Sequence, residues 1–216
     1  MPAHSFSPVA GFYDALARIV FGRKLQEAQA ANLNYIADNS RLLIIGGGSG
    51  WILQQVLFRI CHSRIVYLEA SGSMLRKSEK RNKHNLFSNT VEYRLGTEAD
   101  IYPSEQFDII IANFFLDLFS PSYLDPIAEK LYSALAPGGK WLITDFVPPV
   151  TNFLPAWRAY ILYKSMYLFF RVTCGISATT LPDWENNLKP YPLEKINSAY
   201  FYHGLIKSVV FRNAVA

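Results

Sequence analysis

The hydrophobic residues of this chain fall into short continuous runs separated by amphipathic stretches. Runs such as LLIIG, DIIIAN and WLITDFV are typical of strands in a parallel sheet that helices cover on both faces. We predict strands at about 41–46, 64–69, 91–95, 107–112, 140–147, 197–203 and 205–212, and helices at roughly 12–37, 49–60, 72–86, 122–135 and 155–173. The alternation predicts a doubly wound α/β domain.

Helix start and stop signals agree with this reading. Ser71 and Ser73 are suited to opening the helix that follows the second strand, and the segment APGG (136–139) is expected to end the helix before the fifth. Residues 177–192, SATTLPDWENNLKPYP, are expected to form an irregular loop. No internal repeat or low-complexity segment divides the chain, so we expect a single domain over 1–216.

The first predicted strand ends in a glycine-rich turn, IIGGGSGW, in which Ser49 interrupts the glycines between 46 and 50. Ligands of doubly wound sheets bind outside the carboxyl ends of the strands. Glycine there permits positive φ and close approach of a ligand, and the following helix start favours a negative group. A tight connection without a ligand is the plainer alternative.

The glycine spacing bears on which ligand the turn would bind. The dinucleotide spacing G-x-G-x-x-G would require a third glycine where Trp51 stands, which disfavours NAD. The spacing G-x-G-x-G fits instead.

Composition excludes several classes of function. The 216 residues are 50% hydrophobic with a net charge of +4, well short of the clustered basic charge of a nucleic-acid-binding protein. The cysteines, Cys61 and Cys174, form neither a CxxC nor a Cys/His cluster, so no disulfide framework or metal site is expected. The N-terminus lacks the pattern of a signal peptide, and the default expectation is the cytoplasm.

Four segments in order, LLIIGGGSG, IVYLEASGSMLRKSEKR, FDIIIANFFLDLF and LAPGGKWLITDFV, resemble the class I S-adenosylmethionine-dependent methyltransferases. The resemblance runs continuously over about 40–147 and is nearest to the small-molecule branch with the ubiquinone/menaquinone-type enzymes. It implies a seven-stranded, mostly parallel sheet with an antiparallel last strand. It also implies S-adenosylmethionine as cofactor and a small, apolar or aromatic acceptor.

The resemblance places the cofactor along successive strand ends. The glycine loop would run under its methionine and ribose portions, and Glu69 matches the acid that accepts both ribose hydroxyls; a solvated acid is the alternative. Thr97 stands where related chains have an acid, so the adenine contact falls to Thr97 or Glu98. Tyr13 could close over the cofactor, with its ring facing the sulfonium, or could serve only in the packing of an N-terminal helix. The predicted cofactor-binding residues are Gly46, Gly47, Gly48, Ser49, Gly50, Glu69, Ala70, Thr97, Glu98, Asn113, Phe114 and Tyr13.

One family position is occupied unexpectedly. Related loops often read acid-x-G-x-G-x-G, and the acid position falls on Ile44. That acid supports the loop, so this chain must support it otherwise or bind the cofactor more weakly. With Thr97, this leaves a second hypothesis open, a cofactor-binding module whose chemistry has decayed.

Three residues are candidates for a catalytic base. If 197–203 is a parallel strand, His203 lies at its carboxyl end, on the same sheet edge as the glycine loop, where an imidazole could remove a proton. A plain hairpin residue is the alternative. Asp117 and Asp145 also lie near strand ends and could act as bases or as structural hydrogen-bond partners.

Two flanking segments bear on partners. We expect a helical segment over 1–40 and a lid-like insertion over 148–196, in which 155–176 is apolar around most of its circumference but too charged to span a membrane. That helix could wall an acceptor site, form a dimer seam or lie at a membrane surface, so peripheral membrane contact and a monomer or homodimer stay open. The basic run 74–84 is expected to be a solvated helix face rather than a site for an anionic partner.

Overall fold

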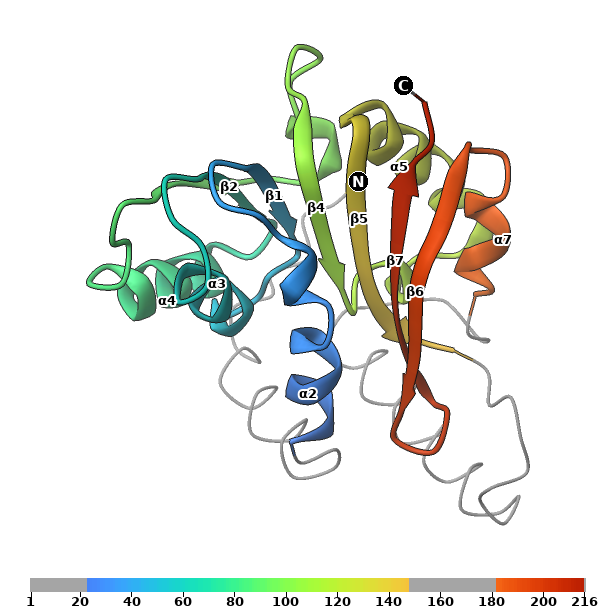
Figure 1. Ribbon diagram of the computed structural model, residues 1–216, viewed down its shortest axis with the longest axis horizontal. Helices are drawn as coiled ribbons and strands as arrows, with labels where there is room; N and C mark the ends of the chain where they lie inside the picture. Colours follow the sequence, from blue (N-terminus) through green and yellow to red (C-terminus); the bar gives the residue numbers. More distant parts are fainter. Residues whose placement is uncertain (1–22, 148–181, 216) are drawn as a thin grey trace.

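The computed structural model describes residues 23–147 and 182–215, in which seven strands form one sheet in the order β3-β2-β1-β4-β5-β7-β6 (Figure 1). β1 to β5 are parallel, and β7 is antiparallel to both of its neighbours. The strands are β1 (Arg41–Ile45), β2 (Arg64–Glu69), β3 (Thr90–Leu95), β4 (Phe107–Asn113), β5 (Leu135–Phe146), β6 (Leu193–Phe201) and β7 (Ile206–Asn213). The predicted fold class is confirmed.

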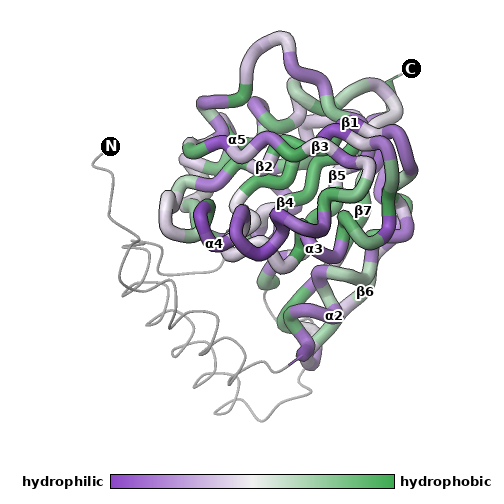
Figure 2. The backbone as a smooth tube through the Cα atoms, turned by 90° about the vertical axis from the view of Figure 1, so that its left-hand side faces the viewer, coloured by the Kyte–Doolittle hydropathy of each residue, from purple (hydrophilic) through white to green (hydrophobic). Residues whose placement is uncertain are grey.

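Helices cover both faces of this sheet. The α-helices are α2 (Lys24–Ala30), α3 (Trp51–Leu57), α4 (Gly72–Asn82), α5 (Pro121–Ser133) and α7 (Trp184–Leu188), and short 3-10 turns are η1 (Leu33–Tyr35), η2 (Glu98–Asp100) and η3 (Leu116–Leu118). Ser71 caps α4 by accepting a hydrogen bond from the Met74 amide, as its position predicted. α4 is coloured mostly hydrophilic in Figure 2, whereas the strands inside are largely hydrophobic.

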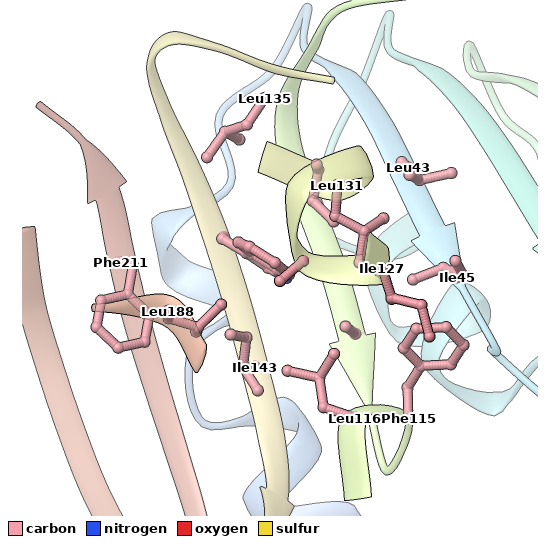
Figure 3. Close-up of a cluster of buried hydrophobic side chains, with 14 of the residues drawn as sticks. Leu43, Ile45, Phe115, Leu116, Ile127, Leu131, Leu135, Ile143, Leu188 and Phe211 are labelled. Atoms are coloured by element: carbon pink, nitrogen blue, oxygen red, sulfur yellow. The ribbon is translucent and has the colours of Figure 1, made fainter. Parts of the chain in front are cut away.

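The two faces hold separate hydrophobic clusters because side chains alternate along each strand. Leu43 and Ile45 of β1 lie on the face of the sheet that α5 covers, in the cluster drawn in Figure 3, which also includes residues of α7. Leu42 and Ile44 point the other way, toward α3 and η1. The inner strands are buried on both sides, which explains why they read as continuous apolar runs, whereas the edge strands β3 and β6 are partly exposed.

Several predicted boundaries were wrong. The segment APGG does not stop a helix, because α5 already ends at Ser133 and β5 begins at Leu135. Its glycines disturb the pairing with β4 instead, since the register shifts between Phe107 and Ile109 and Gly138 has a φ of 70°. The predicted irregular loop contains α7, and β6 begins at Leu193, inside the predicted insertion.

The predicted N-terminal helix is interrupted where the structure describes it. α2 ends at Ala30, and the chain continues through η1. Asn32 follows α2, and its side-chain amide donates to the Ser208 hydroxyl of β7, 2.7 Å away, which fixes this segment on the sheet. Tyr13 and the segment 155–176, which was predicted to be helical, lie outside the described residues.

The strand order reverses direction between β1 and β4, which are hydrogen-bonded neighbours. The loops after these two strands therefore diverge at the sheet's carboxyl edge and leave room for a ligand between them. This switch point positions the candidate site.

Candidate functional site

The glycine loop after β1 requires glycine for two different reasons. Gly46, Gly48 and Gly50 have φ values of 63°, 63° and 84°, in the left-handed region that favours glycine. A Cβ at Gly47 would come within 2.5 Å of the Tyr67 ring, so here the need is space. A Cβ at Gly48 would meet no atom within 4 Å. The loop is therefore packed tightly below and open above Gly48.

Glu69 ends β2 beside this open position. One carboxylate oxygen accepts the Gly48 N–H at 2.9 Å, and the other accepts the Ser71 N–H at 2.8 Å. Glu69 is buried, which raises the pKa of its carboxyl, while the two backbone donors oppose that shift. A carboxylate offers about four lone-pair positions. Roughly two remain for two further donors, such as the hydroxyls of a vicinal diol.

The residues after β2 and β3 complete this half of the site. Ala70 is exposed, next to Glu69. The Thr97 hydroxyl accepts the Ala99 N–H at 3.4 Å, and the Asp100 carboxylate accepts the Thr97 N–H at 2.9 Å, so Thr97 caps η2. Glu98 lies within η2 and is partly exposed. Parallel pairing of β2 with β3 brings both turns to the same edge.

The β4 loop meets the glycine loop directly. A Cβ at Gly46 would come within 2.8 Å of the Phe115 ring, and Figure 3 shows Phe115 beside Ile45 at the end of β1. Phe114 adopts a φ of 51°, and its ring lies 5.1 Å from that of Phe146. The side-chain nitrogen of Asn113 is buried and has no hydrogen-bond partner among the described residues. An unpaired buried donor at this place is suited to a ligand oxygen.

Asp145 and Asp117 form a buried pair beneath the β4 loop. One oxygen of Asp145 accepts the N–H groups of Phe115, Leu116 and Asp117 at 3.3, 2.8 and 3.2 Å, and the other accepts that of Phe146 at 2.9 Å. Burial and the Asp145 charge raise the pKa of the Asp117 carboxyl well above its usual range. The neutral form of Asp117 is therefore favoured, beside Asp145, whose own pKa is raised by burial to about 6. This geometry favours a structural role over that of a base.

His203 lies away from the other candidate residues. It occupies the turn between β6 and β7 at the predicted sheet edge, with a φ of 56°, and its side chain is exposed. β5 and β7 separate β6 from the β1/β4 switch point. With strands about 4.8 Å apart, three to four spacings place His203 roughly 14–19 Å from the glycine loop. The structure does not bring His203 together with the loop.

Two residues that hold the loop were missed. The Tyr67 hydroxyl donates to the Gly48 carbonyl at 2.8 Å, and the Asn82 side-chain nitrogen donates to the Gly50 carbonyl at 3.1 Å. Ser49 accepts a 3.3 Å hydrogen bond from Arg81. Asn82 stands in the basic run that was predicted to be solvated, yet it is fully buried. The sequence did contain a signal for this burial: Ser78 and Asn82 are uncharged residues in a charged helix, and their i, i+4 spacing places them on the same helix face.

The described ranges give two negative results. No group of three or more His, Cys, Asp or Glu side chains there could hold a metal ion. Within 23–147 and 182–215, no helix is long and apolar enough to cross a membrane.

The central part of the chain is similar in sequence to known methyltransferases. Residues 43–141 match a family model described as a methyltransferase domain. The ubiquinone/menaquinone biosynthesis C-methyltransferase UbiE of Methylococcus capsulatus is 26% identical over 169 residues, covering 76% of this chain and 66% of that protein. The Escherichia coli protein of the same name is 26% identical over 168 residues, covering 76% and 65%. The chain thus spans slightly less than two thirds of these relatives.

Comparison with solved structures identifies the same fold. The N-methyltransferase NodS of Bradyrhizobium japonicum, solved with S-adenosyl-L-homocysteine, matches with a TM-score of 0.64 and 15% identity, over 89% of this chain and 87% of that chain. The mitomycin 7-O-methyltransferase MmcR matches with a TM-score of 0.67 and 16% identity, over 99% of this chain and 62% of that chain.

Proposed function

Because the chain belongs to the class I S-adenosylmethionine-dependent methyltransferases, we propose that it transfers the methyl group of S-adenosylmethionine to a small, apolar or aromatic acceptor. The observation that carries this proposal is Glu69. Its carboxylate fixes the Gly48 amide and has acceptor capacity left over, beside the open side of the glycine loop.

The residues at the site fit the cofactor. A ribose diol presents two O–H donors, which match the free lone pairs of Glu69. The open side of Gly48 admits the chain that joins ribose to methionine without displacing a side chain. The unpaired Asn113 amide adds a donor at the next strand end. Thr97 and Glu98 both follow the end of β3, and one of them is proposed to contact the adenine.

The proposed acceptor follows from the aromatic residues around the β4 loop. Phe114 packs on the buried Phe146, and Phe119 lies 5.1 Å from the buried Phe115. Phe114 and Phe119 are partly exposed, so aromatic side chains are accessible after the carboxyl end of β4. The curated relatives are named for ubiquinone/menaquinone biosynthesis, which supports an acceptor of apolar, aromatic character. The apolar 155–176 segment, outside the described residues, is proposed to wall this acceptor site.

The bound cofactor would supply a methyl group already activated on a sulfonium. The protein then has to align the acceptor with that methyl and exclude water. The glycine loop and Glu69 hold one side of this arrangement, and the β4 loop holds the other. Loss of an acid at Ile44 does not remove any of these elements, which favours an active enzyme over the decayed module.

A binding experiment with matched variants tests the proposal. We expect S-adenosylhomocysteine, and not NAD, to bind in isothermal titration calorimetry. Glu69→Ala should weaken binding by about 1.5–3 kcal/mol, roughly 10- to 150-fold, because it removes charge-assisted hydrogen bonds. Glu79→Ala, which removes an exposed carboxylate on α4, is the control and should leave affinity unchanged.

Equal affinities of the two variants would reject the assignment of Glu69. Absence of binding to the wild-type chain would reject the cofactor. Turnover is measured separately, by release of S-adenosylhomocysteine with hydroquinone-type acceptors. Binding without turnover on any acceptor would favour the decayed module.

A further inference from the structure

The carbonyl groups of the glycine loop are tied to buried side chains below it. A loop with three left-handed glycines has many accessible conformations, and its amides point at a ligand only if the intervening carbonyls are fixed. Tyr67 donates to the carbonyl of Gly48 at 2.8 Å, and Asn82 donates to the carbonyl of Gly50 at 3.1 Å. The described chain thus anchors both ends of the segment that forms the open side of the site.

Tyr67 fills the space beneath the loop. It belongs to β2, is fully buried and lies opposite Ile44 in the parallel register of β1 and β2. Its ring is so close to Gly47 that a Cβ there would overlap it. Burial raises the pKa of the Tyr67 hydroxyl, so the hydroxyl keeps its proton and remains a donor throughout the neutral range. Neither the ring nor the hydroxyl can move without the loop moving too.

Asn82 fixes the other end of the segment from α4. Its side-chain nitrogen donates to the Gly50 carbonyl and also to the Ser78 carbonyl, at 3.1 and 2.9 Å. A Cβ at Gly50 would lie 2.7 Å from the Ser78 Cα, so loop and helix are in direct backbone contact here. The hydrogen bond therefore locks α4 against the start of α3.

β1, the strand that leads into the glycine loop, does not supply the side-chain hydrogen bonds that hold it. Ile44 is 1% exposed within the hydrophobic cluster under α3 and offers no polar atom to the loop. β2 and α4 provide the hydrogen bonds instead. We propose that Tyr67 and Asn82 are positioning residues for S-adenosylmethionine, which hold the Gly48–Gly50 segment in its binding conformation before the ligand arrives. This inference rests on the proposed function.

The test compares two tyrosines that differ in one hydrogen bond. Tyr93 packs beside Tyr67 in a tilted arrangement with 5.7 Å between ring centroids, and its hydroxyl is buried without a partner among the described residues. Tyr67→Phe should weaken S-adenosylhomocysteine binding about three- to tenfold, the worth of one net hydrogen bond. Tyr93→Phe should leave it within twofold of wild type. Asn82→Ala is a second, independent variant with the same expected direction.

Two further readouts separate positioning from a general structural role. Amide hydrogen exchange of the unliganded protein should be faster at residues 46–50 in Tyr67→Phe and unchanged in Tyr93→Phe. The loss of affinity should be larger for S-adenosylhomocysteine than for adenosine, because adenosine lacks the amino-acid tail proposed to lie along the loop.

The possible results distinguish this inference from the proposed function. If wild-type protein binds S-adenosylhomocysteine and both Phe variants bind it as tightly as wild type, the positioning role is overturned and the cofactor assignment stands. Equal losses for both ligands, with unchanged exchange at 46–50, would also overturn it. If wild-type protein does not bind, the proposed function fails first.

Discussion

Two loops meet at the switch point of the sheet, and they are held in opposite ways. The loop after β1 consists of glycines whose carbonyls accept hydrogen bonds from neutral side chains below, Tyr67 and Asn82. The loop after β4 has no glycine, and its N–H groups donate to one buried carboxylate, Asp145. In the first loop the Gly46, Gly48 and Gly50 amides are bonded within the protein, and the Gly47 and Ser49 amides donate to no described residue and are left for a ligand. In the second loop three successive amides donate to the same carboxylate.

The difference matches what each loop has to do. A loop that binds a ligand through its backbone needs free donors, and so its support must reach it from the carbonyl side. A loop that presents side chains, such as Phe114 and Phe115, can be fixed through its amides. Gly46 and Phe115 are in contact across the two loops, so a displacement of one loop would also displace the other.

The largest effect is expected at Asp145. In Asp145→Asn the amide nitrogen faces N–H donors that the carboxylate accepted, so buried donors lose their partner. We expect the free energy of unfolding to fall by at least about 3 kcal/mol in urea denaturation. Asp108→Asn breaks an exposed ion pair with Arg41 and should cost no more than about 1 kcal/mol. Similar costs for both would show that Asp145 does not fix the β4 loop.

Two glycine substitutions separate stability from binding in the first loop. Gly50→Ala should cost about 3 kcal/mol, because its Cβ overlaps Ser78 and its φ is 84°. Gly48→Ala meets no neighbour and should cost only about 1–2 kcal/mol of backbone strain. Its methyl group projects into the open side, however, so S-adenosylhomocysteine affinity should fall by at least about tenfold. Equal effects on stability would contradict the packing described for Gly50.

The last effect is the pH dependence of stability contributed by Asp117. A carboxyl whose pKa is raised by folding binds more protons in the folded state. Its stabilisation is therefore complete below the unfolded pKa, about 3.9, and is lost as pH rises toward the folded value. Asp117→Asn keeps a neutral donor and does not titrate. Relative to wild type, the variant should gain stability above about pH 4, by up to about 1.4 kcal/mol per pH unit. Parallel stability curves between pH 4 and 8 would contradict a raised pKa of Asp117 in the folded protein.

The sequence predicted the parts of the molecule that depend on local pattern. Continuous apolar runs marked the strands because both faces are buried, and the glycine spacing marked the loop because positive φ and close packing leave little choice of residue. Glu69 could be placed because it directly follows a buried run. The fold class is therefore confirmed, while the assigned contacts of Glu69 stay a prediction.

What the sequence missed or left open depends on contacts between distant segments. The sequence places His203 on the correct sheet edge, but it does not reveal that β7 lies between β5 and β6. Asn82 looks solvated among lysines and arginines, and only the packing of α4 on the loop buries it. The APGG segment has turn residues, yet it lies within β5, between Leu135 and Lys140, which both pair with β4.

The central claim is that the glycine loop and Glu69 form the cofactor site, and a crystal structure with S-adenosylhomocysteine tests it most directly. We expect both ribose hydroxyls to donate to the Glu69 carboxylate, with the Gly48 N–H bond retained, and the amino-acid tail to lie along the open side of Gly48. Adenine should lie beside the turn that contains Thr97 and Glu98, and no ligand atom should contact His203. A ligand bound elsewhere, or a Glu69 turned away from the ribose, would contradict the account.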